Sequence, residues 1–224
     1  DLDAQAAALG TIRERHPDHR ILAEEDDTPL AERLAAWDGG PLWVVDPLDG
    51  TTNFLHGHPA FSASVAVAVE GRPVAAAVVS GSSGERWWAA RGEGAWRGGR
   101  RIRVSRNRRL ARSLVGTGFP FKALDQLPDY LEQLAGVLRS SSGVRRNGSA
   151  ALDLCMVAQG SLDCFWELLL MPWDFAAGWL LVEEAGGVLA RLDGGPVDLE
   201  SGSLLAASGP ELLDELRERL DGGA

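Results

Sequence analysis

The chain has 224 residues, 45% of them hydrophobic, a composition that supports one large packed domain or two modest ones. Its formal net charge of -10 argues against general affinity for nucleic acid, because such affinity needs a basic surface that displaces counterions from phosphates. No run approaches the roughly 20 apolar residues of a membrane-spanning helix, so no membrane association is predicted.

The two cysteines and the first residues predict a cytoplasmic protein. Cys155 and Cys164 are expected to be reduced, buried thiols, with a disulfide as the less favoured alternative. No basic segment followed by an apolar one precedes the globular pattern, so no secretion signal is predicted.

The first half of the chain, residues 1–110, reads as an N-terminal lobe with an antiparallel sheet. Periodicity and turn residues predict, in chain order, a helix at 3–16 that ends before Pro17, a strand at 20–23, an acidic turn at 24–28, a small helix capped by Thr28, a buried strand at 42–45 and an antiparallel meander over 61–104.

Residues 111–224 read as a second, mixed α/β lobe. Its predicted elements are a helix with Leu127, Leu131, Leu134 and Leu138 at helical spacing, a strand at 143–146, a helix at 149–159, a strand at 162–166, a helix after Asp174, and a last helix from Pro210 that places Leu212, Leu216 and Leu220 on one packed face.

Two aspartates at the end of the buried strand carry the main chemical signal. Pro47 and Gly50 are expected to turn the backbone so that Asp46 and Asp49 face one point. Together with the Leu48 carbonyl they would form a hard oxygen cage suited to magnesium or manganese. The simpler alternative is an Asx turn that caps a helix. A zinc site at 56–58 is disfavoured against a plain turn, since no further histidine or cysteine is near.

The residues after these aspartates suit a phosphate. If a short helix starts at 50–53, its free N–H groups point at an anion, and Thr51 can hold a water molecule beside it. Glu24 at the end of one strand and Asp174 at the start of a helix are candidates for further ligands. Their alternative interpretations are a solvated acidic loop and a helix N-cap.

Four segments resemble the inositol monophosphatase family. They are A-E-E at 23–25, W-V-V-D-P-L-D-G-T-T-N-F at 43–54, G-S-A-A at 148–151 and W-D-F-A-A-G at 173–178. The resemblance covers nearly the whole chain. It implies a layered α/β sandwich of the αβαβα type, as in the inositol monophosphatases and fructose-1,6-bisphosphatases, with the site in a cleft between two lobes.

The resemblance also implies roles for individual residues. Glu24, Asp46 and the Leu48 carbonyl would hold the first metal, and Asp46, Asp49 and Asp174 the second. Glu24 and Thr51 would activate the attacking water, while the N–H groups of Gly50 and Thr51 would bind phosphate. The hydroxyls of the substrate would contact Asp49, Gly148, Ser149, Ala150, Glu167 and Asp174.

Members of this family are usually homodimers inhibited by lithium. The resemblance also implies about two or three magnesium ions in each active site, with manganese as a possible substitute. The first helices of the family and its flexible loop have no counterpart, so the sequence is expected to be truncated. The run 168–171 stands where the family has a glycine and a polar or basic residue; it is interpreted as core or dimer packing, with a greasy substrate rim as the alternative.

The favoured function is hydrolysis of inositol 1-phosphate or a similar polyol monophosphate to the alcohol and inorganic phosphate. Alternatives of the same chemistry are phosphatases for histidinol phosphate, fructose 1,6-bisphosphate or NADP. A different alternative is a module that binds RNA or the transcription machinery through the arginine cluster at 97–112, although an alternating arginine face is more often simply solvated.

Overall fold

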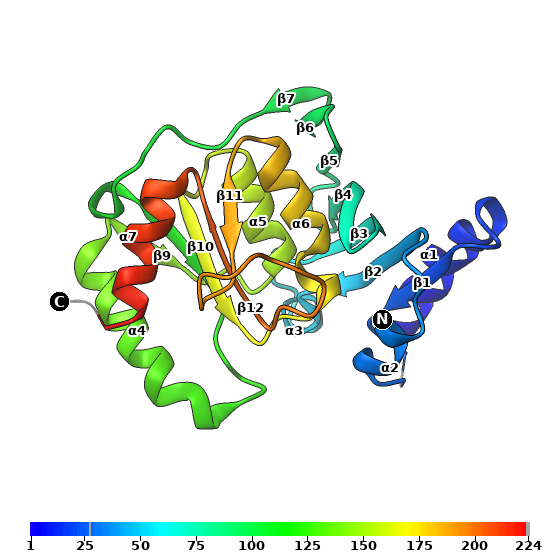
Figure 1. Ribbon diagram of the computed structural model, residues 1–224, viewed down its shortest axis with the longest axis horizontal. Coiled ribbons are helices and arrows are strands. Elements are labelled where there is room, and N and C mark those ends of the chain that lie inside the picture. The colour runs from blue at the N-terminus through cyan, green and yellow to red at the C-terminus, as the bar shows by residue number, and fades with distance from the viewer. Residues whose placement is uncertain (27, 223–224) are drawn as a thin grey trace.

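A seven-stranded sheet forms one side of the molecule in the computed structural model, which describes residues 1–26 and 28–222 (Figure 1). Its strands pair in chain order, the first two in parallel and the rest antiparallel. They are β1 (Arg20–Ala23), β2 (Leu42–Asp49), β3 (Ser62–Val69), β4 (Arg72–Ser80), β5 (Arg86–Ala90), β6 (Gly94–Arg97) and β7 (Arg100–Ile102). The predicted meander is therefore confirmed.

A five-stranded mixed sheet forms the other side, in the order β11-β12-β10-β8-β9. Its strands are β8 (Leu114–Thr117), β9 (Gly143–Arg145), β10 (Cys164–Leu168), β11 (Val188–Ala190) and β12 (Ser203–Ala207). The strand expected at 162–166 is present but begins two residues later, after a turn that follows Gly160. One sheet uses residues before 110 and the other residues after it, but one hydrophobic core spans both, so the division into two lobes stays an interpretation.

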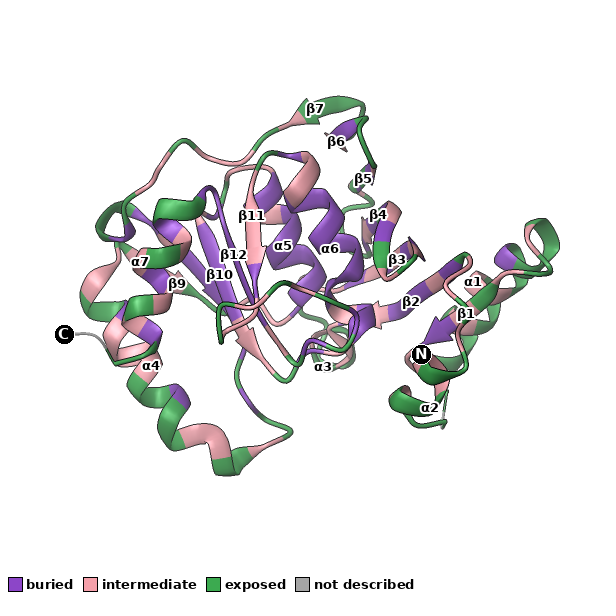
Figure 2. Ribbon diagram, in the orientation of Figure 1, coloured by how far each residue is buried: buried purple, intermediate pink, exposed green. Residues whose placement is uncertain are grey.

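Helices fill three layers around the two sheets. Between the sheets lie α5 (Ala150–Ala158) and α6 (Pro172–Glu184), which Figure 2 shows to be almost entirely buried. On the outer face of the five-stranded sheet lie α4 (Leu127–Ser140) and α7 (Pro210–Leu220), and against the outer face of β2 lies α1 (Leu2–Arg15). The expected αβαβα sandwich is thus confirmed.

The short elements are α2 (Leu30–Ala35), α3 (Thr51–Leu55) and 3-10 helices at Leu110–Arg112 and Leu124–Gln126. Burial on both faces explains why β2 reads as a continuous apolar run: Val44 packs into the central core, whereas Val45 packs with Ile12 of α1. In α7 the predicted stripe of Leu212, Leu216 and Leu220 is buried, as expected.

Two helix details differ from the sequence predictions. Thr28 does not cap α2: Pro29 stands at the cap position, and the Thr28 N–H donates to the Asp26 carboxylate in an Asx turn. Asp27, in the same acidic turn, lies outside the described residues. On α4, Leu131 and Leu138 are 52% and 54% exposed, because the helix packs through Tyr130 and Val137 instead.

Both cysteines are free and buried, as predicted. Within the described part of the chain, no helix has the length and apolar character needed to cross a bilayer.

Candidate metal centre and active site

A β-bulge brings Asp46 and Asp49 onto one face of β2. Asp46 pairs with Ser64 of β3 and Asp49 with Ser62, so three steps on β2 match two steps on β3. Without the extra residue the two side chains would point to opposite faces, because side chains alternate along a strand. The turn expected directly after Asp46 is therefore wrong. The strand continues through the bulge, and the chain turns at Gly50.

Asp174 completes the acidic cluster from the first turn of α6. One oxygen from each of Asp46, Asp49 and Asp174 lies within 4.8 Å of the others. The helix expected after Asp174 begins earlier, at Pro172, and Asp174 accepts a hydrogen bond from the Met171 N–H at 2.7 Å. The N-cap interpretation of Asp174 is therefore wrong, because Met171 is the N-cap and Asp174 is the third helical residue, whose carboxylate bonds back to the cap and also belongs to the cluster.

In each of these carboxylates, a protein donor holds at least one oxygen. Asp46 Oδ1 accepts from the Leu48 N–H at 2.9 Å. Asp49 Oδ2 accepts from the Ser149 hydroxyl at 2.5 Å and from the Ala151 N–H at 2.9 Å. The side chains are therefore fixed in place before any ion binds.

Burial and mutual repulsion disfavour negative charge in this cluster. Burial is the largest cause in each case, and it raises the pKa of Asp46 to about 10, that of Asp174 to about 7 and that of Asp49 to about 6. A divalent cation would remove this cost. An all-oxygen donor set fits magnesium or manganese, and the cluster found among the described residues contains neither His56 nor His58.

Glu24 and Thr51 flank the cluster. Glu24 follows β1; burial raises its pKa, and interaction with the Asp46 side chain partly opposes this rise. It does not belong to the group of three close carboxylates. The Thr51 hydroxyl donates to the Leu48 carbonyl at 3.0 Å, so the expected water-binding residue contacts an expected metal ligand.

Gly50 and Asn53 position the short helix α3 beside the aspartates. Gly50 has a φ of 89°, and a Cβ there would lie 2.8 Å from the Ala60 carbonyl oxygen, so only glycine fits. The Asn53 amide donates to the carbonyls of Ala60 and Asn147 at 2.7 and 2.8 Å. These bonds tie α3 to the loop that carries Gly148.

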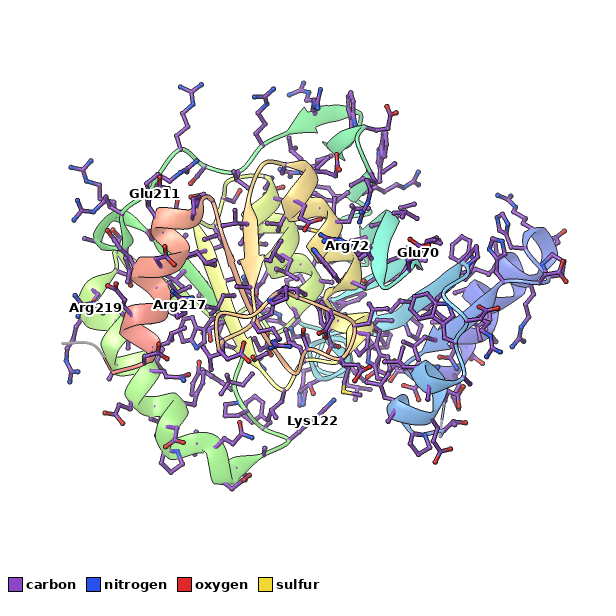
Figure 3. All side chains as sticks on the ribbon, viewed as in Figure 1. Glu70, Arg72, Lys122, Glu211, Arg217 and Arg219 are labelled. Carbon is purple, nitrogen blue, oxygen red and sulfur yellow. The ribbon has the colours of Figure 1, made fainter. Side chains whose placement is uncertain are left out.

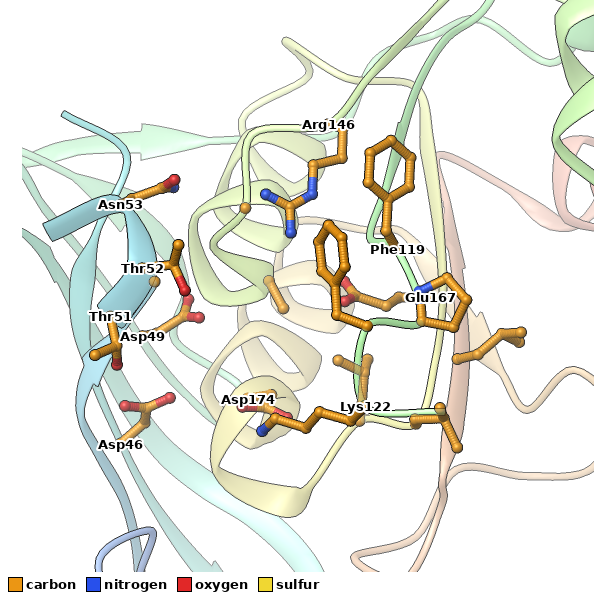
Figure 4. Close-up of a pocket in the computed structure, with 18 of the residues that line it drawn as sticks. Asp46, Asp49, Thr51, Thr52, Asn53, Phe119, Lys122, Arg146, Glu167 and Asp174 are labelled. Carbon is orange, nitrogen blue, oxygen red and sulfur yellow. The ribbon is translucent and has the colours of Figure 1, made fainter. Parts of the chain in front are cut away.

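The other expected substrate contacts gather around the same cavity, which has a volume of about 260 Å³ (Figure 4). Gly148, Ala150 and Glu167 line it. Ser149 does not, because it is buried beneath and its hydroxyl is held by Asp49. Burial raises the pKa of Glu167 well above its usual range, with Asp174 as the next cause.

Residues 168–171 lie partly in the hydrophobic core and partly at the rim of the cavity. Leu170 is buried in the central core, as favoured, but Leu169 is 36% exposed at the cavity edge with a φ of 61°. A leucine in the left-handed region is strained. The greasy-rim alternative is thus correct for Leu169.

The wall opposite the aspartates was not predicted from the sequence; Phe119, Phe121, Lys122 and Arg146 line the cavity there (Figure 4). The guanidinium of Arg146 stacks on both rings, 5.2 Å from the Phe119 centroid and 5.1 Å from that of Phe121. One sequence signal could have pointed to this wall, since Lys122 is the only lysine in the chain.

Known proteins are similar to this chain in fold and in sequence. The model of the inositol monophosphatase family matches residues 1–221. The Nus factor SuhB of Pseudomonas aeruginosa is 42% identical over 210 residues, covering 93% of this chain and 76% of that protein.

Two solved structures superpose on nearly the whole chain, each at 38% identity. The extragenic suppressor protein suhB of Bartonella henselae has a TM-score of 0.90 and covers 100% of this chain and 84% of that one. An inositol monophosphatase of Anabaena has a TM-score of 0.91, with coverages of 99% and 86%.

The two-sheet sandwich and its carboxylate centre are of the kind found in phosphatases that use metal ions. The chain belongs to the inositol monophosphatase family.

Proposed function

We propose that this protein is a magnesium-dependent phosphomonoesterase that hydrolyses inositol 1-phosphate or a similar polyol monophosphate to the alcohol and inorganic phosphate. One observation carries the proposal: two buried aspartates and a half-buried one, each already oriented by a backbone N–H or a hydroxyl, converge within 4.8 Å beside a small open cavity. Manganese would suit the same oxygen ligands.

In the proposed reaction, Asp46, Asp49 and Asp174 would hold the ions together with Glu24 and the Leu48 carbonyl. When bound, the ions would neutralise charge on the attacking and leaving oxygens. Glu24 and the Thr51 hydroxyl orient the attacking water, and the N–H groups of Gly50 and Thr51 bind the phosphate. Gly148, Ala150 and Glu167 face the alcohol, while Ser149 acts from below by holding Asp49.

Replacing Asp46 tests the metal assignment. Asp46→Asn should reduce the rate with inositol 1-phosphate to less than about a tenth, because losing a shared ligand costs several kcal/mol of transition-state stabilisation. Asp129→Asn, an exposed change on α4, is the matched control and should keep the full rate. An Asp46→Asn protein that keeps more than a tenth of its activity would show that the assignment is wrong.

The substrate is decided by a panel of phosphate esters. We expect inositol 1-phosphate to exceed histidinol phosphate, fructose 1,6-bisphosphate and NADP in kcat/KM. A preference of more than about tenfold for one of these three would replace the proposed substrate. The same proposal includes inhibition by lithium, a homodimeric state and a cytoplasmic location. Inhibition assays test the first, light scattering the second and cell fractionation the third.

A second candidate is binding to the transcription machinery or RNA. It is favoured by relatives named Nus factor SuhB and by the surface between β7 and β8. Arg97, Arg108 and Arg109 form ion pairs within the chain. Among the described residues, no ion pair is found for the exposed arginines at 100, 101, 103, 106 and 112. Figure 3 shows side chains extending outward along this edge.

The test replaces Arg103, Arg106 and Arg112 by glutamine. RNA binding that weakens with salt and is lost in this variant would support the candidate. The control removes three charges elsewhere, at Arg13, Arg15 and Arg139. Equal loss in both variants would indicate only general electrostatic attraction and would reject the site.

A further inference from the structure

Lys122 is distinctive both because of its residue type and because of its position in the fold. It is the one lysine among 22 lysine and arginine residues, and it lines the candidate active site. It follows Phe121 in the loop between β8 and the 3-10 helix at Leu124–Gln126, and its side chain is exposed. In Figure 4 it extends from the Phe119 wall toward Asp174.

The ammonium group acts on the acidic side of the cavity without being bound there. Its charge lowers the pKa of Glu24 and of Asp174, although burial dominates both values. Yet no hydrogen bond or ion pair joins Lys122 to another residue in the described part of the chain. Arg72 and Arg109, by contrast, are paired with Glu183 and Glu215 at 2.9 Å. Its three N–H donors are therefore available to a ligand.

The charges that line the cavity indicate the charge of the ligand that Lys122 would bind. Five carboxylates line it, at Glu24, Asp46, Asp49, Glu167 and Asp174, against only two basic residues. A phosphate ester carries up to two negative charges, and a cation beside its oxygens offsets the repulsion from this set.

Of the two basic residues, Lys122 is the one suited to a moving phosphoryl group. Arg146 is fixed in its stack on Phe119 and Phe121. A lysine is a compact charge on a flexible stem, whereas an arginine presents a rigid planar fork.

We propose that Lys122 binds the phosphoryl group of the substrate, and afterwards inorganic phosphate, from the wall opposite Thr51. This inference rests on the proposed phosphatase function. The ammonium donates hydrogen bonds to a non-bridging phosphoryl oxygen and transfers no proton, so it is a catalytic residue through contact and charge. This role requires a cationic side chain that does not already form an ion pair with a carboxylate of the protein.

Binding of inorganic phosphate in the presence of magnesium tests the contact directly. Lys122→Gln should weaken phosphate binding in calorimetry by about tenfold or more, because a hydrogen bond to a charged group contributes about 1.5–3 kcal/mol. KM should rise by a similar factor. Lys122→Arg should recover part of the affinity, and Arg139→Gln, which removes an exposed charge on α4, should change nothing.

The single lysine allows a second measurement that does not depend on turnover. Within these 224 residues, an amine-reactive reagent can modify only Lys122 and the terminal amine, and peptide mass spectrometry separates the two. Magnesium with phosphate should slow modification of Lys122 several-fold beyond magnesium alone, while the terminal amine reacts at an unchanged rate.

The outcomes separate the two proposals. If the wild type hydrolyses phosphate esters but Lys122→Gln keeps phosphate affinity and KM, the role of Lys122 is overturned and the phosphatase stands. Tighter magnesium binding in Lys122→Gln with unchanged phosphate binding would likewise overturn it, by showing a counter-ion for the carboxylates. If no ester is hydrolysed yet phosphate still protects Lys122, the contact stands and the phosphatase fails; no hydrolysis with no protection rejects both.

Discussion

At the scale of single residues, the acidic centre is ordered by hydrogen bonds from its own fold. The Asp49 carboxylate is held by Ser149 and Ala151 through Oδ2, and Asp174 is held by the Met171 N–H through its own Oδ2. A carboxylate that must first be ordered loses binding energy to that ordering. In this protein, folding has already ordered these carboxylates, so an ion would bind without that loss.

Ser149 illustrates how a residue can serve the site without lining it. Its hydroxyl donates to Asp49 and accepts from the Leu152 N–H at 3.3 Å, so it caps α5 and fixes a candidate metal ligand at the same time. The G-S-A-A motif therefore has a structural explanation, in which one side chain joins the start of α5 to the acidic cluster.

At the scale of elements, the junction of β2 and α3 is the critical connection. β2 delivers both aspartates, and α3 must then turn away sharply beneath the loop that carries Gly148. Gly50 makes this turn with a positive φ and in contact with the Ala60 carbonyl and the Gly148 carbonyl. The backbone at Gly50 therefore lies too close to the backbone at Ala60 and Gly148 for any side chain to fit between them.

Gly50→Ala should therefore destabilise the protein by about 3 kcal/mol, since it adds a steric overlap to the strain of a left-handed residue. Gly57→Ala is the matched control: Gly57 has a φ of 67°, but a Cβ there meets nothing within 4 Å, so the cost should be about 1 kcal/mol. Chemical denaturation measures both. Equal losses for the two variants would contradict the crowded-turn explanation.

At the scale of the whole molecule, the site is assembled across both sheets. The seven-stranded sheet supplies Asp46 and Asp49, the central helix layer supplies Asp174, and the five-stranded sheet and its loops supply Glu167 and Lys122. One core runs between these elements, so the cavity is held by the same packing that holds the fold.

This assembly explains what the sequence could predict. Carboxylates at strand and helix ends, read with the family motifs, predicted the acidic cluster, and alternation predicted the meander. The bulge at Pro47 and Leu48 was not predicted, because it appears only in the pairing of β2 with β3. The wall of Phe119, Lys122 and Arg146 carries no local pattern and comes together only when two separate loops meet.

The buried carboxylates link the stability of the whole molecule to pH and metal. Each pKa is raised on folding, from 3.8 to about 6 for Asp49 and to about 7 for Asp174. The folded protein therefore binds more protons than the unfolded chain between these values, and stability falls as pH rises through them. In a chelator, the melting temperature should thus decrease from pH 5 to pH 8.

Magnesium should reverse this decrease, since it binds the ionised carboxylates of the folded protein only, and its stabilising effect should grow over the same range. Thermal melts at fixed pH with chelator or with magnesium measure both trends. Asp153, whose pKa burial raises to about 7, adds to the decrease in chelator, but it lies outside the cluster and should not respond to magnesium. Asp129→Asn, exposed on α4, should reproduce the wild-type trends. A stabilising effect of magnesium that does not grow from pH 5 to pH 8 would contradict the assignment of the acidic cluster as a cation site.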